Sequence, residues 1–170
     1  MTARAPLTAF SFYLSGRNQV LLSIAGEILA NLDACGDDPL TTDSRARASD
    51  LMWLWTLGAY EVVRTMCQAN GCFSARLLGA LAELKIDLER VRVPNTKMER
   101  IRYDRRQRAI PVPSDRGPDL WDPSRKDLRV GDPSDAISAR MLLAAYQRVM
   151  SSLTADDVVM RHEDSFERGR

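Results

Sequence analysis

The stretch LMWLWTLGAYEVVRTMC (residues 51–67) carries most of the information on the fold. Apart from Glu61 and Arg64 it consists almost entirely of Leu, Met, Trp, Val, Ala and Tyr, so apolar side chains would surround a helix on nearly every side. A helix of this kind is normally central, with neighbours covering several of its faces. Asn70-Gly71 follows as a stop signal, because glycine enters the left-handed conformation at no steric cost. We therefore predict a central helix over residues 50–70, and the sequence leaves its start open between Thr42 and Asp50.

The segments on both sides of this stretch have the spacing of amphipathic helices. Apolar residues recur at steps of three and four from Val20 to Leu32, from Leu77 to Val91 and from Ile137 to Leu153. We predict an all-α fold, an antiparallel bundle of four main helices over residues 15–34, 50–70, 74–106 and 135–153. Pro94 is expected to end or kink the third helix, because proline lacks an amide hydrogen.

Residues 109–133 differ in composition from the helical segments. Five of the eight prolines lie here, so we predict a long proline-rich loop with short extended pieces at residues 110–112 and 128–130. Such a loop is often a lid, an arm or a segment that binds a partner. The polar residues 155–170 are expected to form a flexible tail, and residues 1–170 a single domain.

The overall composition limits the classes of partner. Lys and Arg number 24 against 23 acidic residues, and the formal net charge of +1 gives no global field for nucleic acid or an anionic membrane. The chain has no apolar run of the ~18 residues that a membrane span needs. Its N-terminus lacks the apolar core of a secretory signal. Three cysteines without paired close spacing are typical of free thiols, so we expect a cytoplasmic protein with no membrane contact.

Residues suited to catalysis or metal binding are few. A di-iron bundle needs Glu-x-x-His pairs and structural zinc needs four Cys or His ligands, whereas His162 is the only histidine. Cys67 lies in an apolar stretch, where cysteine usually behaves as a small hydrophobe. No glycine-rich phosphate loop is present. The sequence therefore predicts no catalytic residue, no metal and no cofactor, and favours a protein that is not an enzyme.

One candidate site lies on the central helix. Glu61 and Arg64 are three residues apart and can pair on one helix face, but a charged pair in apolar surroundings is costly unless it is satisfied. One interpretation is a polar pocket for a carboxylate or phosphate ligand, whose candidate residues are Tyr60, Glu61, Arg64, Arg92, Lys97 and Glu99. The alternative, which we favour, is a structural ion-pair network or a pair at a solvated edge.

A second candidate is the basic segment from Arg90 to Arg108. It has eight basic residues against Glu99 and Asp104, a net charge of about +6. Arginine forks match phosphate oxygens and a tyrosine can stack on a base. The candidate nucleic-acid-binding residues are Arg100, Arg102, Tyr103, Arg105, Arg106 and Arg108. The alternative is a solvated face that pairs with acids elsewhere.

The only histidine, His162, directly follows Arg161. In the number and length of its helices, the predicted layout resembles the HEPN type of helical bundle, small prokaryotic proteins often linked to RNA cleavage or nucleotidyl transfer. The nuclease motif of that family is an arginine followed a few residues later by a histidine, and no arginine stands at that distance before His162. The resemblance therefore covers helix number and size, and it assigns no site residue.

Two functional hypotheses follow. The first is a non-enzymatic binding or assembly protein, a homodimer or other homo-oligomer that acts through protein partners. Its apolar helix surface exceeds what a lone small bundle needs, and symmetric dimerisation commonly buries such surface. The second is an RNA- or polyanion-binding, HEPN-like helical protein that uses the segment from Arg90 to Arg108.

Overall fold

The computed structural model describes residues 6–36, 42–97, 99–113 and 119–167. This part of the chain is mostly helical, as predicted, and it also contains five strands that the all-α prediction left out. The four long helices are α2 (Phe12–Ala34), α3 (Thr42–Gln68), α4 (Ala75–Lys97) and α5 (Ala139–Ser151). The shorter elements are helices α1 (Pro6–Phe10) and α6 (His162–Glu167) and the 3-10 turns η2 (Asn70–Cys72) and η3 (Ala155–Asp157).

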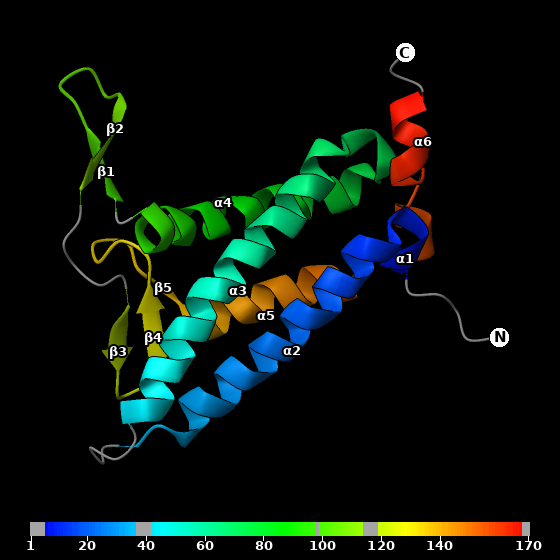
Figure 1. The fold of residues 1–170 in the computed structure, drawn as a ribbon. Coiled ribbons are helices and arrows are strands. Elements are labelled where there is room, and N and C mark those ends of the chain that lie inside the picture. The colour runs from blue at the N-terminus through cyan, green and yellow to red at the C-terminus, as the bar shows by residue number, and fades with distance from the viewer. Residues whose placement is uncertain (1–5, 37–41, 98, 114–118, 168–170) are drawn as a thin grey trace.

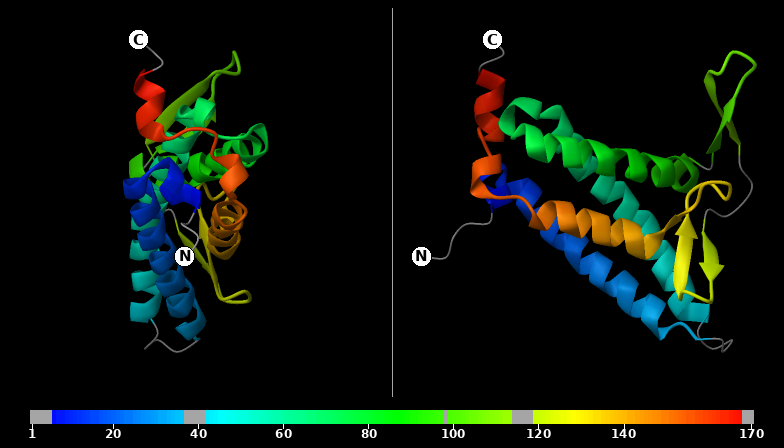
Figure 2. Two further views of the ribbon diagram at one scale, coloured as in Figure 1. Left: turned by 90° about the vertical axis from the view of Figure 1, so that its right-hand side faces the viewer. Right: turned by 180° about the vertical axis from the view of Figure 1, so that it is seen from behind.

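The long helices pack around one core. α2 and α3 run side by side in opposite directions, α4 packs on α3, and α5 contacts both α4 and α2 (Figure 1, Figure 2). Met52, Trp55 and Val63 of α3 are fully buried between these neighbours. The helix therefore has the central position that its apolar composition predicts, although one edge leaves Trp53 and Leu54 44% and 49% exposed.

Two helices begin at other residues than the predicted bounds give. α3 begins at Thr42, the earliest start that the sequence leaves open, rather than at residue 50, and its polar first turns are held by contacts with other elements. Arg47 pairs with Glu27 of α2, and the Arg45 guanidinium lies over the Trp121 ring. α5 begins at Ala139 rather than residue 135, because the Ser138 hydroxyl accepts a hydrogen bond from the Met141 amide and caps the helix there.

The third predicted helix, 74–106, is too long. α4 continues through Pro94 to Lys97, and residues 99–113 form an antiparallel hairpin of β1 (Glu99–Tyr103) and β2 (Ala109–Pro113). Arginine alternates with Ile101 and Tyr103 along β1, which is the period of a strand. Pro111 and Pro113 are two residues apart, so both fall at positions whose missing amide leaves a two-stranded ladder intact.

The predicted loop 109–133 also contributes two strands to a small sheet. β3 (Leu120–Asp122), β4 (Asp127–Val130) and β5 (Ile137–Ser138) pair antiparallel in that order. Leu128 and Val130 of β4 are buried against the helices, which explains why this short strand forms. The extended pieces expected at 110–112 and 128–130 thus correspond to parts of β2 and β4, but their pairing partners were not predicted.

Residues 155–167 of the predicted flexible tail are ordered by contacts with other elements. Asp157 is buried and accepts hydrogen bonds from the Ser74 hydroxyl (2.5 Å) and from the Thr154 amide (3.0 Å) and hydroxyl (2.9 Å), and it also pairs with Arg76. The His162 ring of α6 packs against Phe10 of α1, with 5.0 Å between ring centroids. These contacts order residues whose polar sequence alone predicts fraying.

Candidate functional site

The β1–β2 hairpin stands out from the helices at the end of α4 (Figure 1, Figure 2). Five arginines lie on its strands and connecting turn, at positions 100, 102, 105, 106 and 108. Because alternate positions of a strand belong to opposite faces, positions 100 and 102 share one face of β1. The side chains of Arg100 and Arg102 lie outside the described residues. The basic segment of the sequence is therefore an arm rather than the continuation of a helix.

Asp104 organises the turn of the hairpin. Its Oδ1 accepts hydrogen bonds from the backbone amides of Arg106 and Arg108, each at 2.8 Å, and its Oδ2 accepts from Arg108 Nε at 2.9 Å. These bonds hold the pKa of Asp104 below its ordinary value, the amide of Arg108 being the main cause. Gln107 takes a positive φ of 58°, which completes the reversal of the chain.

Arg105 and Arg106 are exposed at this turn. Among the described residues, no carboxylate forms an ion pair with either side chain, whereas Arg108 is neutralised by Asp104. Tyr103 and Ile110 on the strands are 69% and 43% exposed. The structure thus brings four of the predicted nucleic-acid-binding residues, Tyr103, Arg105, Arg106 and Arg108, to one projecting element.

Tyr60 connects α3 to α4 through polar contacts. Its hydroxyl donates to Glu89 Oε1 at 2.9 Å, and Lys85 Nζ donates to the same oxygen at 3.0 Å. The Arg92 guanidinium lies over the Tyr60 ring, 4.5 Å from its centroid. Two of the predicted ligand-binding residues, Tyr60 and Arg92, are therefore in contact. Lys85 and Glu89 belong to the same cluster, and the sequence reasoning missed both.

The charges of this cluster shift the pKa values of its members. Burial, with the hydrogen bond to Glu89 and its negative charge, raises the pKa of Tyr60. Burial acts to raise the pKa of Glu89, but the hydrogen bonds from Lys85 and Tyr60 and the nearby cations outweigh it and lower that pKa. The hydrogen bond to Glu89 raises the pKa of Lys85. At neutral pH the cluster holds one carboxylate and two cations, and its net charge is positive.

Glu61 and Arg64 pair at the surface. Arg64 donates to Glu61 Oε2 from Nη2 at 2.6 Å and from Nε at 3.0 Å, and the two side chains are 49% and 38% exposed. This edge of α3 faces solvent, which agrees with the favoured interpretation of a pair at a solvated edge. The ligand-binding role of these two residues stays a prediction. Lys97 and Glu99, predicted members of the same site, have side chains outside the described residues.

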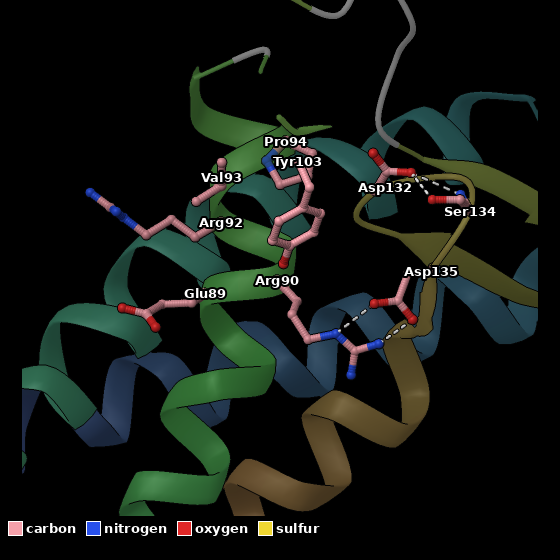
Figure 3. Close-up of a pocket in the computed structure, with 9 residues that line it drawn as sticks. All are labelled: Glu89, Arg90, Arg92, Val93, Pro94, Tyr103, Asp132, Ser134 and Asp135. Atoms are coloured by element: carbon pink, nitrogen blue, oxygen red, sulfur yellow. Dashed lines mark hydrogen bonds and ion pairs between the residues drawn. The ribbon is translucent and has the colours of Figure 1, made fainter. Parts of the chain in front are cut away.

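A pocket of about 470 Å³ lies at the base of the hairpin (Figure 3). The end of α4, Tyr103 of β1 and the connection from β4 to β5 surround it. Its described lining residues are Glu89, Arg90, Arg92, Val93, Pro94, Tyr103, Asp132, Ser134 and Asp135. Gly131 allows the connection to approach α4: its φ is +100°, and a Cβ at this position would lie 3.2 Å from the Arg90 carbonyl oxygen.

Two carboxylates of the pocket are held in place by hydrogen bonds. Arg90 Nε donates to Asp135 Oδ2 at 3.0 Å, Arg90 Nη2 donates to the other oxygen of Asp135, and this contact raises the pKa of Arg90. The amide and hydroxyl of Ser134 donate to Asp132 Oδ1 at 2.9 and 2.5 Å. Sequence reasoning missed these acids. The Asp-x-Ser turn at 132–134 was the available local signal, but nothing local indicated contact with α4.

No known protein family, curated protein or solved structure matches the chain in the comparisons. Within the described ranges, no group of three or more His, Cys, Asp or Glu side chains is arranged to hold a metal ion. In the same part of the chain, no helix has both the length and the apolarity that crossing a bilayer requires. The candidate sites therefore rest on the geometry of the hairpin, the Tyr60 cluster and the pocket.

Proposed function

We propose that the chain binds RNA or another polyanion through the basic hairpin, residues 99–113. The observation that carries this proposal is the pair of exposed arginines, Arg105 and Arg106, at the turn of a projecting two-stranded arm. Two-stranded arms of this kind are a recurrent means of reaching the groove or backbone of a nucleic acid. The helices α2 to α5 act as an antiparallel bundle in a single cytoplasmic domain that supports the arm.

The distribution of charge supports the same proposal. The whole chain has a formal net charge of only +1, so attraction to phosphate depends on a local concentration of arginine. The guanidinium fork binds phosphate oxygens through two parallel hydrogen bonds, and a guanidinium without a carboxylate partner keeps this capacity. Arg92, stacked on Tyr60 near the end of α4, extends the positive surface toward the helices.

Equilibrium binding of a fluorescently labelled single-stranded RNA tests the proposal. We expect Arg105→Ala/Arg106→Ala to weaken binding roughly tenfold at low salt, since phosphate contacts dominate non-specific affinity. The matched control is Arg17→Ala/Arg148→Ala, which removes the same charge from exposed positions of α2 and α5. If both double variants lose the same RNA affinity, the loss comes from net charge and not from the hairpin. If the wild-type protein does not bind RNA, the proposal is refuted.

Self-association is the second candidate function. Its support is the exposure of apolar side chains on α2 and α3, where Val20, Trp53 and Leu54 are 59%, 44% and 49% exposed. Burial of such surface favours a homodimer or a complex with a protein partner.

Sedimentation equilibrium at micromolar concentrations tests this second candidate. Leu54→Lys should convert a dimer to monomers, whereas Met141→Lys, at an exposed apolar position of α5, should leave the dimer intact. A wild-type protein that sediments as a strict monomer over the whole range contradicts self-association.

A further inference from the structure

We infer that the pocket at the base of the hairpin holds one unpaired nucleobase that carries an exocyclic amino group. The inference rests on the proposed function and names its substrate more closely: a single-stranded nucleic acid, with cytosine preferred to uracil. The arginines at the turn would contact the backbone, and the pocket would hold a base of the same strand.

The pocket has the size and the walls that such a base requires. Its volume of about 470 Å³ lies within the range of roughly 300–1,000 Å³ that is usual for small-molecule sites. The ring of Tyr103 and the side chains of Val93 and Pro94 form one wall, and Asp132, Ser134 and Asp135 lie across the opening from them (Figure 3). The remaining lining residues, Glu89, Arg90 and Arg92, are charged. The apolar wall suits the face of a flat ring, and the polar side chains suit its edge.

Tyr103 is the element that distinguishes a base from other ligands. Its side chain is 69% exposed although it lines a pocket, and packing within the chain does not account for a large aromatic ring in that position. A base can stack on a tyrosine ring whatever its identity, and this contact is a main source of affinity for single strands. Tyr103 is also only two residues from Arg105, so base and backbone contacts lie within reach of one strand.

The carboxylates supply the preference among bases. An ionised carboxylate only accepts hydrogen bonds, so it matches the amino group of cytosine, adenine or guanine and repels the carbonyl oxygen that uracil has in its place. Asp135 is fixed by two bonds from Arg90, and Asp132 by two from Ser134. Because these bonds hold the carboxylates before any ligand arrives, little side-chain entropy remains to be lost on binding.

The test compares labelled oligo(C) and oligo(U) of equal length, two strands whose bases differ in the group that would face the acids. We expect the wild-type protein to bind oligo(C) at least roughly fivefold more tightly than oligo(U). Tyr103→Ala should weaken oligo(C) binding roughly tenfold, whereas Tyr103→Phe, which keeps the ring, should not. Asp132→Asn keeps the oxygen that holds Ser134 but adds a donor, so it should bring the two affinities together.

The outcomes separate the pocket from the hairpin. Arg105→Ala/Arg106→Ala should weaken binding of both strands by the same factor and leave their ratio unchanged. Equal wild-type affinity for the two strands, together with full affinity in Tyr103→Ala, overturns the pocket inference while the proposed function stands. Failure of the wild-type protein to bind either strand overturns both.

Discussion

Replacement of Tyr146 by phenylalanine tests the contact that joins α5 to α2. The Tyr146 side chain is fully buried, and its hydroxyl donates to Asn18 Oδ1 at 2.9 Å. Its ring also meets the Trp55 ring edge to face, with 5.3 Å between centroids. The substitution keeps the ring and this aromatic contact and removes only the hydroxyl, so the change in stability measures the hydrogen bond.

The surroundings of Asn18 determine the size of the effect. An acceptor left without a partner in a protein interior costs about 1–3 kcal/mol. Asn18 is 7% exposed and lines a cavity of about 190 Å³, so water can reach its amide and the lower end of that range applies. We therefore expect Tyr146→Phe to lower the free energy of unfolding by about 1 kcal/mol, against about 3–5 kcal/mol for removal of the whole ring in Tyr146→Ala.

Urea unfolding followed by tryptophan fluorescence measures both changes in free energy. The dependence of the unfolding free energy on urea concentration should have the same slope in the variants as in the wild-type protein. Tyr13→Phe is the matched control: this side chain is 81% exposed, so loss of its hydroxyl should have no measurable effect. Adding Asn18→Leu to Tyr146→Phe should recover part of the loss, because neither polar group then lacks a partner. If Tyr146→Phe is as stable as the wild-type protein, the buried hydrogen bond between Tyr146 and Asn18 does not stabilise the fold as we claim.

Three further predictions concern stability. The hydrogen bonds that the Asp157 carboxylate accepts, chiefly the one from the Ser74 hydroxyl, lower its pKa. Their contribution to stability is therefore complete above the ordinary carboxyl pKa and is lost as the pH falls toward the lowered one, so the fall of the urea midpoint in acid should be flatter in Asp157→Asn. Gly131 has a positive φ, so Gly131→Ala should destabilise the protein by about 1 kcal/mol or more in the same assay. Gly79→Ala, in open space on α4, should instead stabilise it by about 0.5–1 kcal/mol, and equal effects of the two substitutions would contradict the positive φ of Gly131. Arg64→Met should leave the urea midpoint nearly unchanged because the pair is exposed, and a large loss would mean that it is buried.

The helices could be predicted from the sequence because their signal is local and apolar. Met52, Trp55, Val63 and Met66 lie at spacings that place them on the covered side of one helix, and all four are fully buried. Periodicity does not give the exact ends. Pro94 is an ordinary stop signal, because proline lacks the amide hydrogen, yet α4 continues for three residues beyond it.

The hairpin and the pocket depend on signals that the sequence carries weakly. Arginine alternates with Ile101 and Tyr103 along β1, so the period of two is present, but it extends over too few residues to distinguish a strand from the end of the preceding helix. Asp135 and Arg90 are 45 residues apart, and the conformation of Gly131, with its positive φ, suits the close approach of their elements. Contacts of this kind depend on the tertiary fold and have no local signal in the sequence.

The salt dependence of RNA binding tests the account most directly. The equilibrium constant should fall linearly with salt on logarithmic axes, with a slope of about −0.7 for each phosphate contact of a single strand. Loss of two contacts in Arg105→Ala/Arg106→Ala should therefore reduce the slope by about 1.4, and Arg17→Ala/Arg148→Ala should leave it unchanged. Identical slopes for the wild-type protein and the hairpin variant would contradict the claim that this arm binds the phosphate backbone.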